Sequence, residues 1–356
     1  MTTILVTGAC GFVGSTLIRR WVSHSSHRII GLDNLARPGS ELNRGELRAL
    51  GVAVQHADLR LASDLNDLPP ADVVIDAAAS PSVLGGLDGR TSSRQLIEHN
   101  LIGTINMLEY CKSRGAALVL LSTSRVYAIA PLAALPVRPS IDAFELDATV
   151  KLPAGTSANG VTEAFPTTPP ISLYGAAKLA SEQLALEYGS AFRFPVWINR
   201  CGVMAGAGQF GRADQGIFTF WIHSWLRRRP LQYIGFDGEG RQVRDCMHPR
   251  DLGELIDRQL SAESDTTRPR VVNAGGGVKS ARSLAQLSAW CRDRLGPHEV
   301  ESVLEPRTFD VPWMVLDASA AGAAWQWAPS TTTDEICEEI LAHAKMHPEW
   351  LAISSD

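Results

Sequence analysis

A tyrosine and a lysine stand four residues apart in the segment "SLYGAAKLASE", which runs from residue 172 to residue 182. In a helix this spacing places Tyr174 and Lys178 on one face. A free tyrosine titrates near ~10, and a nearby ammonium stabilises the phenolate and lowers that pKa. The pair could therefore act as a general base. A packed tyrosine beside a solvated amine is the alternative that the spacing alone leaves open.

A hydroxyl that could hold a substrate oxygen is found in the segment "LSTSRVY". This segment ends a predicted strand over residues 117–124. In open α/β folds, ligands bind at the carboxyl ends of the strands. Thr123 is the best candidate for this hydroxyl.

Three glycines lie between the first predicted strand (residues 3–8) and a predicted helix (residues 14–24), in the segment "TGACGFVG". Glycines at such a turn let the backbone approach a pyrophosphate, which then lies on the helix N-terminus. Asp33 follows Gly14 by nineteen residues, at the end of the second predicted strand. A carboxylate there can accept hydrogen bonds from the hydroxyls of an adenosine ribose. The predicted contacts are Gly8, Gly11, Phe12, Val13, Gly14, Asp33 and Asn34.

The predicted cofactor is NAD, because the carboxylate of Asp33 would repel the 2′-phosphate of NADP. Arg37 lies nearby in the sequence and keeps NADP as an alternative. A second alternative is that the glycines serve only helix–strand packing and that Asp33 is a turn residue.

Short apolar runs alternate with amphipathic stretches through the first half of the chain. Strands are predicted over residues 3–8, 28–34, 52–60, 72–79, 117–124 and 195–206. Helices are predicted over residues 93–115, with Gly115 as its C-cap, and 172–192, with an apolar stripe of Ala176, Leu179, Ala180 and Leu184. Fully apolar strands between helices indicate an α/β fold whose parallel sheet is covered on both faces. Residues 127–170 are rich in Ala, Pro and Thr and lack a period, so they form either a lid or a surface insert.

Composition excludes several classes of protein. The chain has 356 residues with a net charge of −5 and no long basic run, which argues against a nucleic-acid polymer as partner. Its six cysteines form no CxxC motif, which indicates a reduced, cytoplasmic environment. No signal peptide or long apolar run is visible, so no membrane contact is expected. His343 and His347 are spaced i, i+4 without a third ligand, so no metal is predicted.

The glycine motif, "STSRVY" and "YGAAK" together resemble the extended short-chain dehydrogenase/reductase family, in the same order and over essentially the whole chain. The resemblance implies a Rossmann-type doubly wound sheet with a smaller C-terminal α/β substrate-binding domain. It divides the chain into an NAD-binding domain (1–200, with 241–262 returning to it) and a substrate-binding region (201–240 and 263–356). It also implies a homodimer. The implied catalytic residues are Thr123, Tyr174 and Lys178, of which the last two also contact the cofactor; the further implied cofactor contacts are Asp58, Leu59, Ala77, Ala78, Ala79 and Asn100.

The resemblance to this family also indicates which reaction to expect. Similar dehydratases carry Asp-Glu directly after the catalytic threonine, where this chain has Ser124 and Arg125. Arginine cannot act as the general acid, so dehydration is disfavoured. The segments "INRCGVMAGAGQFGRADQGIFTFW" and "GEGRQVRDCMHPRDL" resemble the CDP-tyvelose (CDP-paratose) 2-epimerase branch of the family.

This likeness implies a nucleotide-diphosphate sugar as substrate. Val203 stands where most such members have an asparagine that helps to hold the diphosphate. Arg244 and Arg307 match arginines that bind phosphate, and planar guanidinium groups suit phosphate oxygens. A structural ion pair is the alternative for each arginine. A net dehydrogenase or reductase, a 4-epimerase of another nucleotide sugar and a non-catalytic NAD-binding regulator remain alternatives to a 2-epimerase.

Overall fold

The computed structural model describes residues 1–25, 27–87, 89, 92–262, 265 and 267–353. Its centre is a sheet of seven strands in the order β14-β10-β5-β4-β1-β2-β3, and every neighbouring pair is parallel. The strands are β1 (Thr3–Thr7), β2 (Arg28–Asp33), β3 (Ala53–His56), β4 (Val73–Asp76), β5 (Ala117–Thr123), β10 (Val196–Cys201) and β14 (Val271–Ala274). The predicted α/β class with a doubly wound parallel sheet is therefore confirmed.

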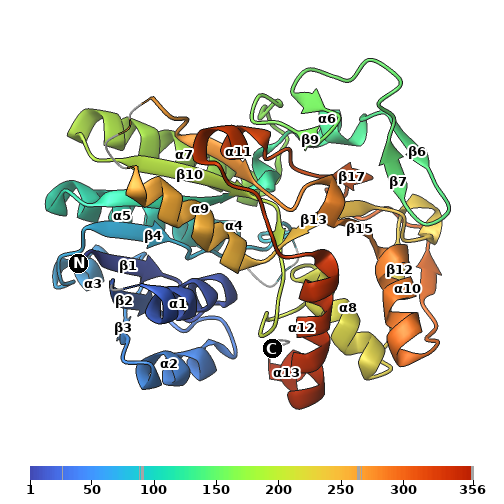
Figure 1. The fold of residues 1–356 in the computed structure, drawn as a ribbon, viewed down its shortest axis with the longest axis horizontal. Helices are drawn as coiled ribbons and strands as arrows, with labels where there is room; N and C mark the ends of the chain where they lie inside the picture. Colours follow the sequence, from blue (N-terminus) through green and yellow to red (C-terminus); the bar gives the residue numbers. More distant parts are fainter. Residues whose placement is uncertain (26, 88, 90–91, 263–264, 266, 354–356) are drawn as a thin grey trace.

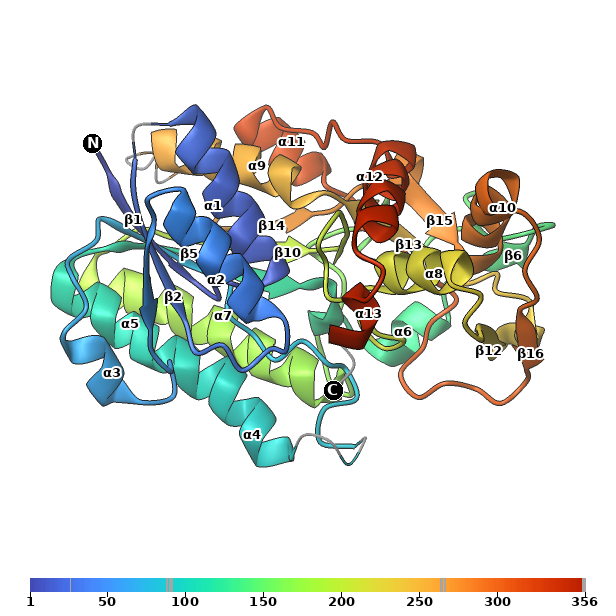
Figure 2. The ribbon, with the colours of Figure 1, turned by 90° about the horizontal axis from the view of Figure 1, so that it is seen from below.

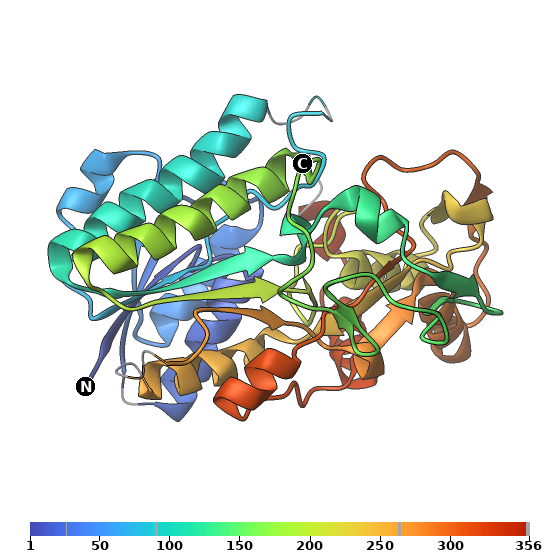
Figure 3. The ribbon, with the colours of Figure 1, turned by 90° about the horizontal axis from the view of Figure 1, so that it is seen from above.

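Helices cover both faces of this sheet (Figures 2 and 3). One face carries α1 (Phe12–His24), α2 (Ser40–Ala49), α9 (Pro249–Ser261) and α11 (Ser319–Trp325); the other carries α3 (Ala62–Asn66), α4 (Ser93–Ile97), α5 (Gly103–Arg114) and α7 (Ser172–Phe192). Successive strand residues point to opposite faces. Ile4 and Val6 of β1 accordingly lie in the core beneath α1 and α9, and Leu5 lies in the core beneath α5 and α7.

The long helix predicted over residues 93–115 is helical throughout, but it contains a π-helical segment, η1 (Glu98–Ile102), between α4 and α5. Gly115 ends it in the left-handed conformation with φ 67°, and its N–H donates to the carbonyl of Cys111. This is the predicted glycine cap.

The apolar stripe predicted for α7 packs against the core through Leu179 and Leu184, but it is not the most buried face of the helix. Its members Ala176, Leu179, Ala180 and Leu184 are only partly buried, whereas Tyr174, Lys178, Ser181 and Glu182 are buried. The reason is that α7 packs against β5 and β10 on one side and against α4, η1 and α5 on the other. Polar groups facing the sheet find partners there: Glu182 forms a buried ion pair of 2.7 Å with Arg200 on β10.

The second region of the molecule lies beside the carboxyl ends of the strands (Figure 1). A small sheet joins β11 (Val203–Met204), β13 (Val243–Met247), β15 (Ala281–Ser283) and β17 (Trp313–Met314), and a separate pair joins β12 (Gln232–Ile234) and β16 (Glu301–Val303). Around them lie α8 (Ile217–Leu226), α10 (Leu284–Leu295), α12 (Thr333–Met346) and α13 (Trp350–Ile353). Trp221, Trp225 and Trp290 lie in the core that α8, α10 and α12 share.

The chain crosses between the two regions more often than the implied domain division allows. Strand β14 lies within residues 263–356, which were assigned to the substrate-binding region, yet it is an edge strand of the central sheet. Within residues 241–262, α9 packs against α1, whereas β13 belongs to the small sheet. The assignment of β14 is therefore corrected, and the remaining division stays a prediction.

Residues 127–170 form a docked insert. They contain α6 (Ile129–Ala133) and two hairpins, β6 (Val137–Pro139) with β7 (Phe144–Leu146) and β8 (Thr156–Ser157) with β9 (Gly160–Val161). The N–H of Phe144 donates to the carbonyl of Arg241 at 2.9 Å, and the N–H of Val161 donates to the carbonyl of Val315 at 2.8 Å. These bonds tie the insert to the second region. Among the described residues, no helix has both the length and the apolar character needed to cross a membrane.

Candidate active site

A cleft of about 1060 Å³ runs along the carboxyl ends of the central strands. It opens where the strand order reverses between β1 and β4, the place at which open α/β sheets bind ligands. The second region forms its opposite wall through residues 202–218, 242–244, 282–287 and 307–310. No residue of the insert 127–170 lines this cleft, which favours the surface insert over the lid.

One end of the cleft, here called the glycine end, is formed by Gly8, Gly11, Gly14 and Asp33. A Cβ atom on Gly8 would lie 2.9 Å from the Cα of Ala78, and one on Gly14 would lie 2.2 Å from the carbonyl oxygen of Gly8. Only glycine permits so close an approach of α1 to the turn. Gly11 provides no side-chain cap for α1, so the first-turn N–H groups face the cleft. They offer a site for an anion such as pyrophosphate.

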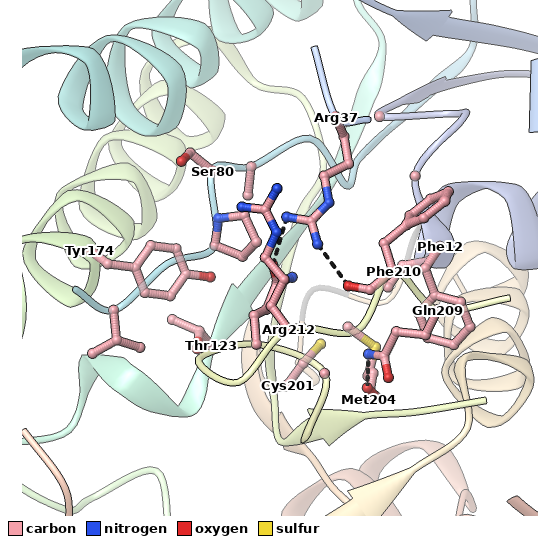
Figure 4. A pocket seen from close by; sticks show the side chains of 18 of the residues that line it. Phe12, Arg37, Ser80, Thr123, Tyr174, Cys201, Met204, Gln209, Phe210 and Arg212 are labelled. Carbon is pink, nitrogen blue, oxygen red and sulfur yellow. Dashed lines mark hydrogen bonds between the residues drawn. The ribbon is translucent and has the colours of Figure 1, made fainter. Parts of the chain in front are cut away.

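The carboxylate of Asp33 is held in place by the backbone. It accepts hydrogen bonds from the N–H groups of Cys10 and Leu35, each at 2.8 Å. Burial raises its pKa, and these bonds act in the opposite direction. The guanidinium of Arg37 donates to the carbonyl of Phe210 at 2.7 Å and to the side chain of Gln215 at 3.1 Å (Figure 4). Since Arg37 is engaged there, a 2′-phosphate would have to compete for it, and this favours NAD over NADP.

With one exception, the remaining predicted cofactor residues also line the cleft. Asp58 and Leu59 line the cleft, as do Ala77, Ala78 and Ala79. Arg60 forms an ion pair with Asp58 and holds the pKa of that carboxyl well below its usual range.

Asn100 does not line the cleft, and its predicted direct contact is corrected. Its buried amide accepts from the N–H of Ser80 at 2.8 Å and donates to the Ser80 carbonyl at 3.0 Å. It therefore positions the loop after β4, which itself lines the cleft.

The three predicted catalytic residues meet at the middle of the cleft. Thr123 ends β5, and its hydroxyl accepts from the N–H of Arg125 at 3.1 Å. The side chains of Thr123 and Tyr174 lie side by side in the cleft (Figure 4). Lys178 follows one turn later on α7 and is 2% exposed.

Burial of Tyr174 opposes the expected lowering of its pKa. Burial raises that pKa to about 12 and outweighs the Thr123 side chain and the charge of Arg125, both of which act to lower it. Burial also lowers the pKa of Lys178, whereas the nearby Asp76, Cys201 and Glu182 act to raise it. The raised pKa favours the neutral form of the phenol.

The other end of the cleft, here called the arginine end, is formed by Arg125, Arg244, Arg307 and Asp310. Arg244 forms an ion pair with Asp310 and donates to the carbonyl of Val243 at 2.7 Å. The structural ion pair considered for Arg244 is therefore present, and both its members line the cleft. Arg307 donates to the carbonyl of Ala213 at 3.2 Å. No ion pair of Arg307 is present within the described part of the chain.

The loop of residues 206–216 was not predicted to contribute individual residues, yet it crosses the mouth of the cleft. Gln209 and Phe210 lie on its wall (Figure 4), and Asp214 accepts from the hydroxyl of Ser82 at 3.1 Å. From the C-terminal side, the indole N–H of Trp350 donates to the carbonyl of Gln209 at 2.8 Å, and its ring stacks on Phe210. Contacts between residues so far apart in sequence leave no local signal. In the sequence, the unusual "FGRADQG" segment was the signal that could have indicated the contribution of this loop to the cleft.

Comparison with known proteins identifies the family. The NAD dependent epimerase/dehydratase family matches residues 4–275. The chain belongs to this family. It is therefore an NAD-dependent enzyme of the extended short-chain dehydrogenase/reductase type, and the glycine end fits its cofactor.

Individual relatives have low sequence identity to this chain but align with nearly its whole length. CDP-paratose 2-epimerase of Salmonella typhi is 26% identical over 346 residues, which cover 93% of this chain and 96% of that protein. A probable UDP-glucuronate 4-epimerase of Rhizobium meliloti (strain 1021) is 25% identical, with 93% of each chain covered. The crystal structure of UDP-glucuronic acid 4-epimerase from Bacillus cereus, in complex with UDP-glucuronic acid and NAD, superposes with a TM-score of 0.77 at 25% identity. That match covers 97% of this chain and 99% of the other.

Proposed function

We propose that this enzyme epimerises a nucleotide-diphosphate sugar by transient oxidation of a sugar hydroxyl. The observation that carries the proposal is that Thr123, Tyr174 and Lys178 line the same cleft, with Ser124 and Arg125 following the threonine. This set contains a base but no acid suited to removing a hydroxyl group. NAD, when bound, accepts a hydride from the sugar carbon and returns it.

The chain's own residues have the following roles in the proposal. Thr123 holds the oxygen of the sugar hydroxyl, and Tyr174 takes its proton and later gives it back. Lys178 favours the charged form of the phenol. Arg244 and Arg307 bind the diphosphate, and the pairing of Arg244 with Asp310 holds that guanidinium at the cleft wall. Return of the hydride to the opposite face of the ketone inverts the carbon without net oxidation.

The substrate within this class is proposed to be a CDP-linked dideoxyhexose inverted at C2. Support comes from the "FGRADQG" likeness and from the similarity to CDP-paratose 2-epimerase over nearly the whole chain. The similarity to UDP-glucuronate 4-epimerases makes inversion at C4 of a UDP-linked sugar the second candidate.

The test follows deuterium at the inverted carbon by NMR, after a panel of CDP- and UDP-sugars has revealed the substrate. Substrate deuterated at that carbon should give an epimer that keeps its deuterium, and unlabelled substrate in D₂O should take up none. NADH should not accumulate. Solvent deuterium at the inverted carbon would mean enolisation, and steady formation of NADH would mean a net dehydrogenase.

A further inference from the structure

Loop 206–216 lies between β11 and α8 and crosses the mouth of the cleft. Four of its residues are glycines, namely Gly206, Gly208, Gly211 and Gly216. Gln209 ties the base of the loop to the second region: its amide donates to the carbonyl of Met204 at 2.7 Å and accepts from the hydroxyl of Thr219 at 3.0 Å. Glycines let the backbone change its path easily, so the rest of the loop can move while its base stays in place.

Arg37 fastens this loop to the region of the central sheet. It follows β2, and its guanidinium donates to the carbonyl of Phe210 at 2.7 Å and to the side-chain oxygen of Gln215 at 3.1 Å (Figure 4). The Phe210 ring is buried as well: a Cβ atom on Gly39 would lie 2.6 Å from it, and the ring of Trp350 stacks on it. One arginine thus holds two positions of the loop, and both bonds must break before the loop can move away from the sheet.

Two further contacts join the loop to neighbouring strand ends. The hydroxyl of Ser82, in the segment after β4, donates to the carboxylate of Asp214 at 3.1 Å. A Cβ atom on Gly206 would lie 3.2 Å from the ring of Phe12, at the start of α1 and after β1. The loop therefore contacts segments that follow β4, β1 and β2, which are neighbours in the sheet. A dinucleotide binds at these same strand ends in open α/β folds.

Two other arginines near the loop are suited to a direct contact with a ligand. Arg307, at the arginine end, donates to the carbonyl of Ala213 at 3.2 Å. Arg212 lines the cleft from the loop itself (Figure 4). Each guanidinium suits a phosphate group, so replacing it would mix a lost ligand contact with an effect of the loop. Ser82 separates the two effects best, because it carries no charge and is not among the described residues that line the cleft.

We propose that the bonds from Arg37 and Ser82 hold loop 206–216 over the NAD site and that their release limits how fast NAD enters and leaves. These bonds join protein groups to one another, so weakening them should speed both directions of exchange. Loss of a direct contact with NAD would instead speed only its departure. Arg37 and Ser82 are therefore positioning residues that act through the loop.

This role of the loop needs only NAD binding, which follows from family membership, and it goes beyond the proposed sugar chemistry. It bears on that chemistry in one respect. An NAD molecule that accepts a hydride and returns it needs no exchange between turnovers, whereas a net dehydrogenase has to release NADH each time. A fastened loop therefore suits an epimerase better than a dehydrogenase.

The test measures NAD exchange in Ser82→Ala, Arg37→Met and the wild type. Protein loaded with tritiated NAD is diluted into excess unlabelled NAD, and the label that stays bound gives the dissociation rate constant. Calorimetric titration gives Kd, and the dissociation rate constant divided by Kd gives the association rate constant. Both rate constants should rise by about two- to tenfold in Ser82→Ala and by at least about tenfold in Arg37→Met, with Kd within about threefold of the wild type. Arg48→Met is the control and should exchange NAD as the wild type does, since Arg48 donates to the carbonyl of Val54 on β3 at 3.3 Å.

Unchanged exchange in both Ser82→Ala and Arg37→Met would overturn the proposal, because NAD would then pass by the arginine end with the loop as a fixed wall. Faster dissociation with an unchanged association rate constant would overturn it too, since a direct contact with NAD would have been lost. Equally fast exchange in Arg48→Met would reduce the effect to general loosening and reject the proposal. If both rate constants rise as expected in a protein that epimerises no nucleotide sugar, the proposed function fails and the role of the loop stands.

A covalent bridge should have the opposite effect. Ser82→Cys combined with Asp214→Cys places one thiol on each side of the contact, and a short bismaleimide can join them. The six native cysteines are buried, so the reagent should act on the introduced pair. After loading and cross-linking, tritiated NAD should leave at least about tenfold more slowly than from the same variant before cross-linking. Equal rates before and after cross-linking would overturn the proposal.

Discussion

At the glycine end of the cleft, backbone lies against backbone, whereas at the arginine end long side chains reach across loops. The turn at Gly8 and the first turn of α1 touch so closely that no Cβ atom fits between them. At the other end, Arg244 and Arg307 are held by Asp310 and by the carbonyl of Ala213, through side chains with several rotatable bonds. The backbone therefore shapes the glycine end, and side chains shape the arginine end.

The difference has a consequence for what each end can recognise. A backbone site changes only if the strand, turn and helix move together, so it suits a ligand that stays the same. A side-chain site changes with single substitutions, so it suits a ligand that differs among relatives. This fits a family whose name states one cofactor and whose similar members act on different sugars.

Tyr174 lies where the two ends meet, and its replacement should have the largest effect. Tyr174→Phe should fold and bind NAD, because the phenol oxygen is not needed for packing. It should lose about 10²–10⁴-fold in kcat, since a general base typically contributes that much. Turnover of the nucleotide sugar and calorimetric titration with NAD measure the two properties separately. Wild-type turnover in this variant would show that another group is the base.

The matched control is Tyr188→Phe on the same helix, where the hydroxyl bonds only to Glu109 at the surface. It should turn over as the wild type does. A similar loss in both variants would indicate damage to α7 rather than removal of a base.

Gly14→Ala tests the backbone character of the glycine end. Its Cβ atom would lie 2.2 Å from the carbonyl oxygen of Gly8, which cannot move aside without shifting the turn. We expect NAD affinity, measured by calorimetry, to fall at least about tenfold, which corresponds to about 1.4 kcal/mol. Gly45→Ala on α2 is the control, since nothing lies within 4 Å of its added Cβ. Equal NAD affinity in wild type and Gly14→Ala would show that the glycine end does not depend on this close backbone contact.

The contrast between the glycine end, built by the backbone, and the arginine end, built by side chains, also explains which features could be predicted from the sequence. The central sheet and the glycine end depend on strand, turn and helix signals that lie within a few residues, and those predictions agree with the structure. The burial of α7 was mispredicted because the periodicity rule assumes that a helix buries its apolar stripe. In this helix Glu182 and Lys178 are buried, and Glu182 pairs with Arg200 on the sheet.

Long-range contacts account for the other failures. Nothing near Asn100 in the sequence shows that its amide binds Ser80, and nothing near residue 210 shows that Trp350 stacks there.

The smallest effect is expected at Trp350, which contacts the loop 206–216 from outside the cleft. Trp350→Phe keeps a ring against Phe210 but loses the hydrogen bond to Gln209. A hydrogen bond of this kind contributes about 0.5–1.5 kcal/mol, so the loop 206–216 should be held in its observed position less firmly. KM for the nucleotide sugar should rise by about two- to tenfold, with kcat near the wild-type value. Met346→Ala, at a 69% exposed position on α12, is the control. If Trp350→Phe instead lowered kcat as strongly as Tyr174→Phe does, the loop would have to position the reacting groups themselves. The arginine end would then be as rigidly defined as the glycine end.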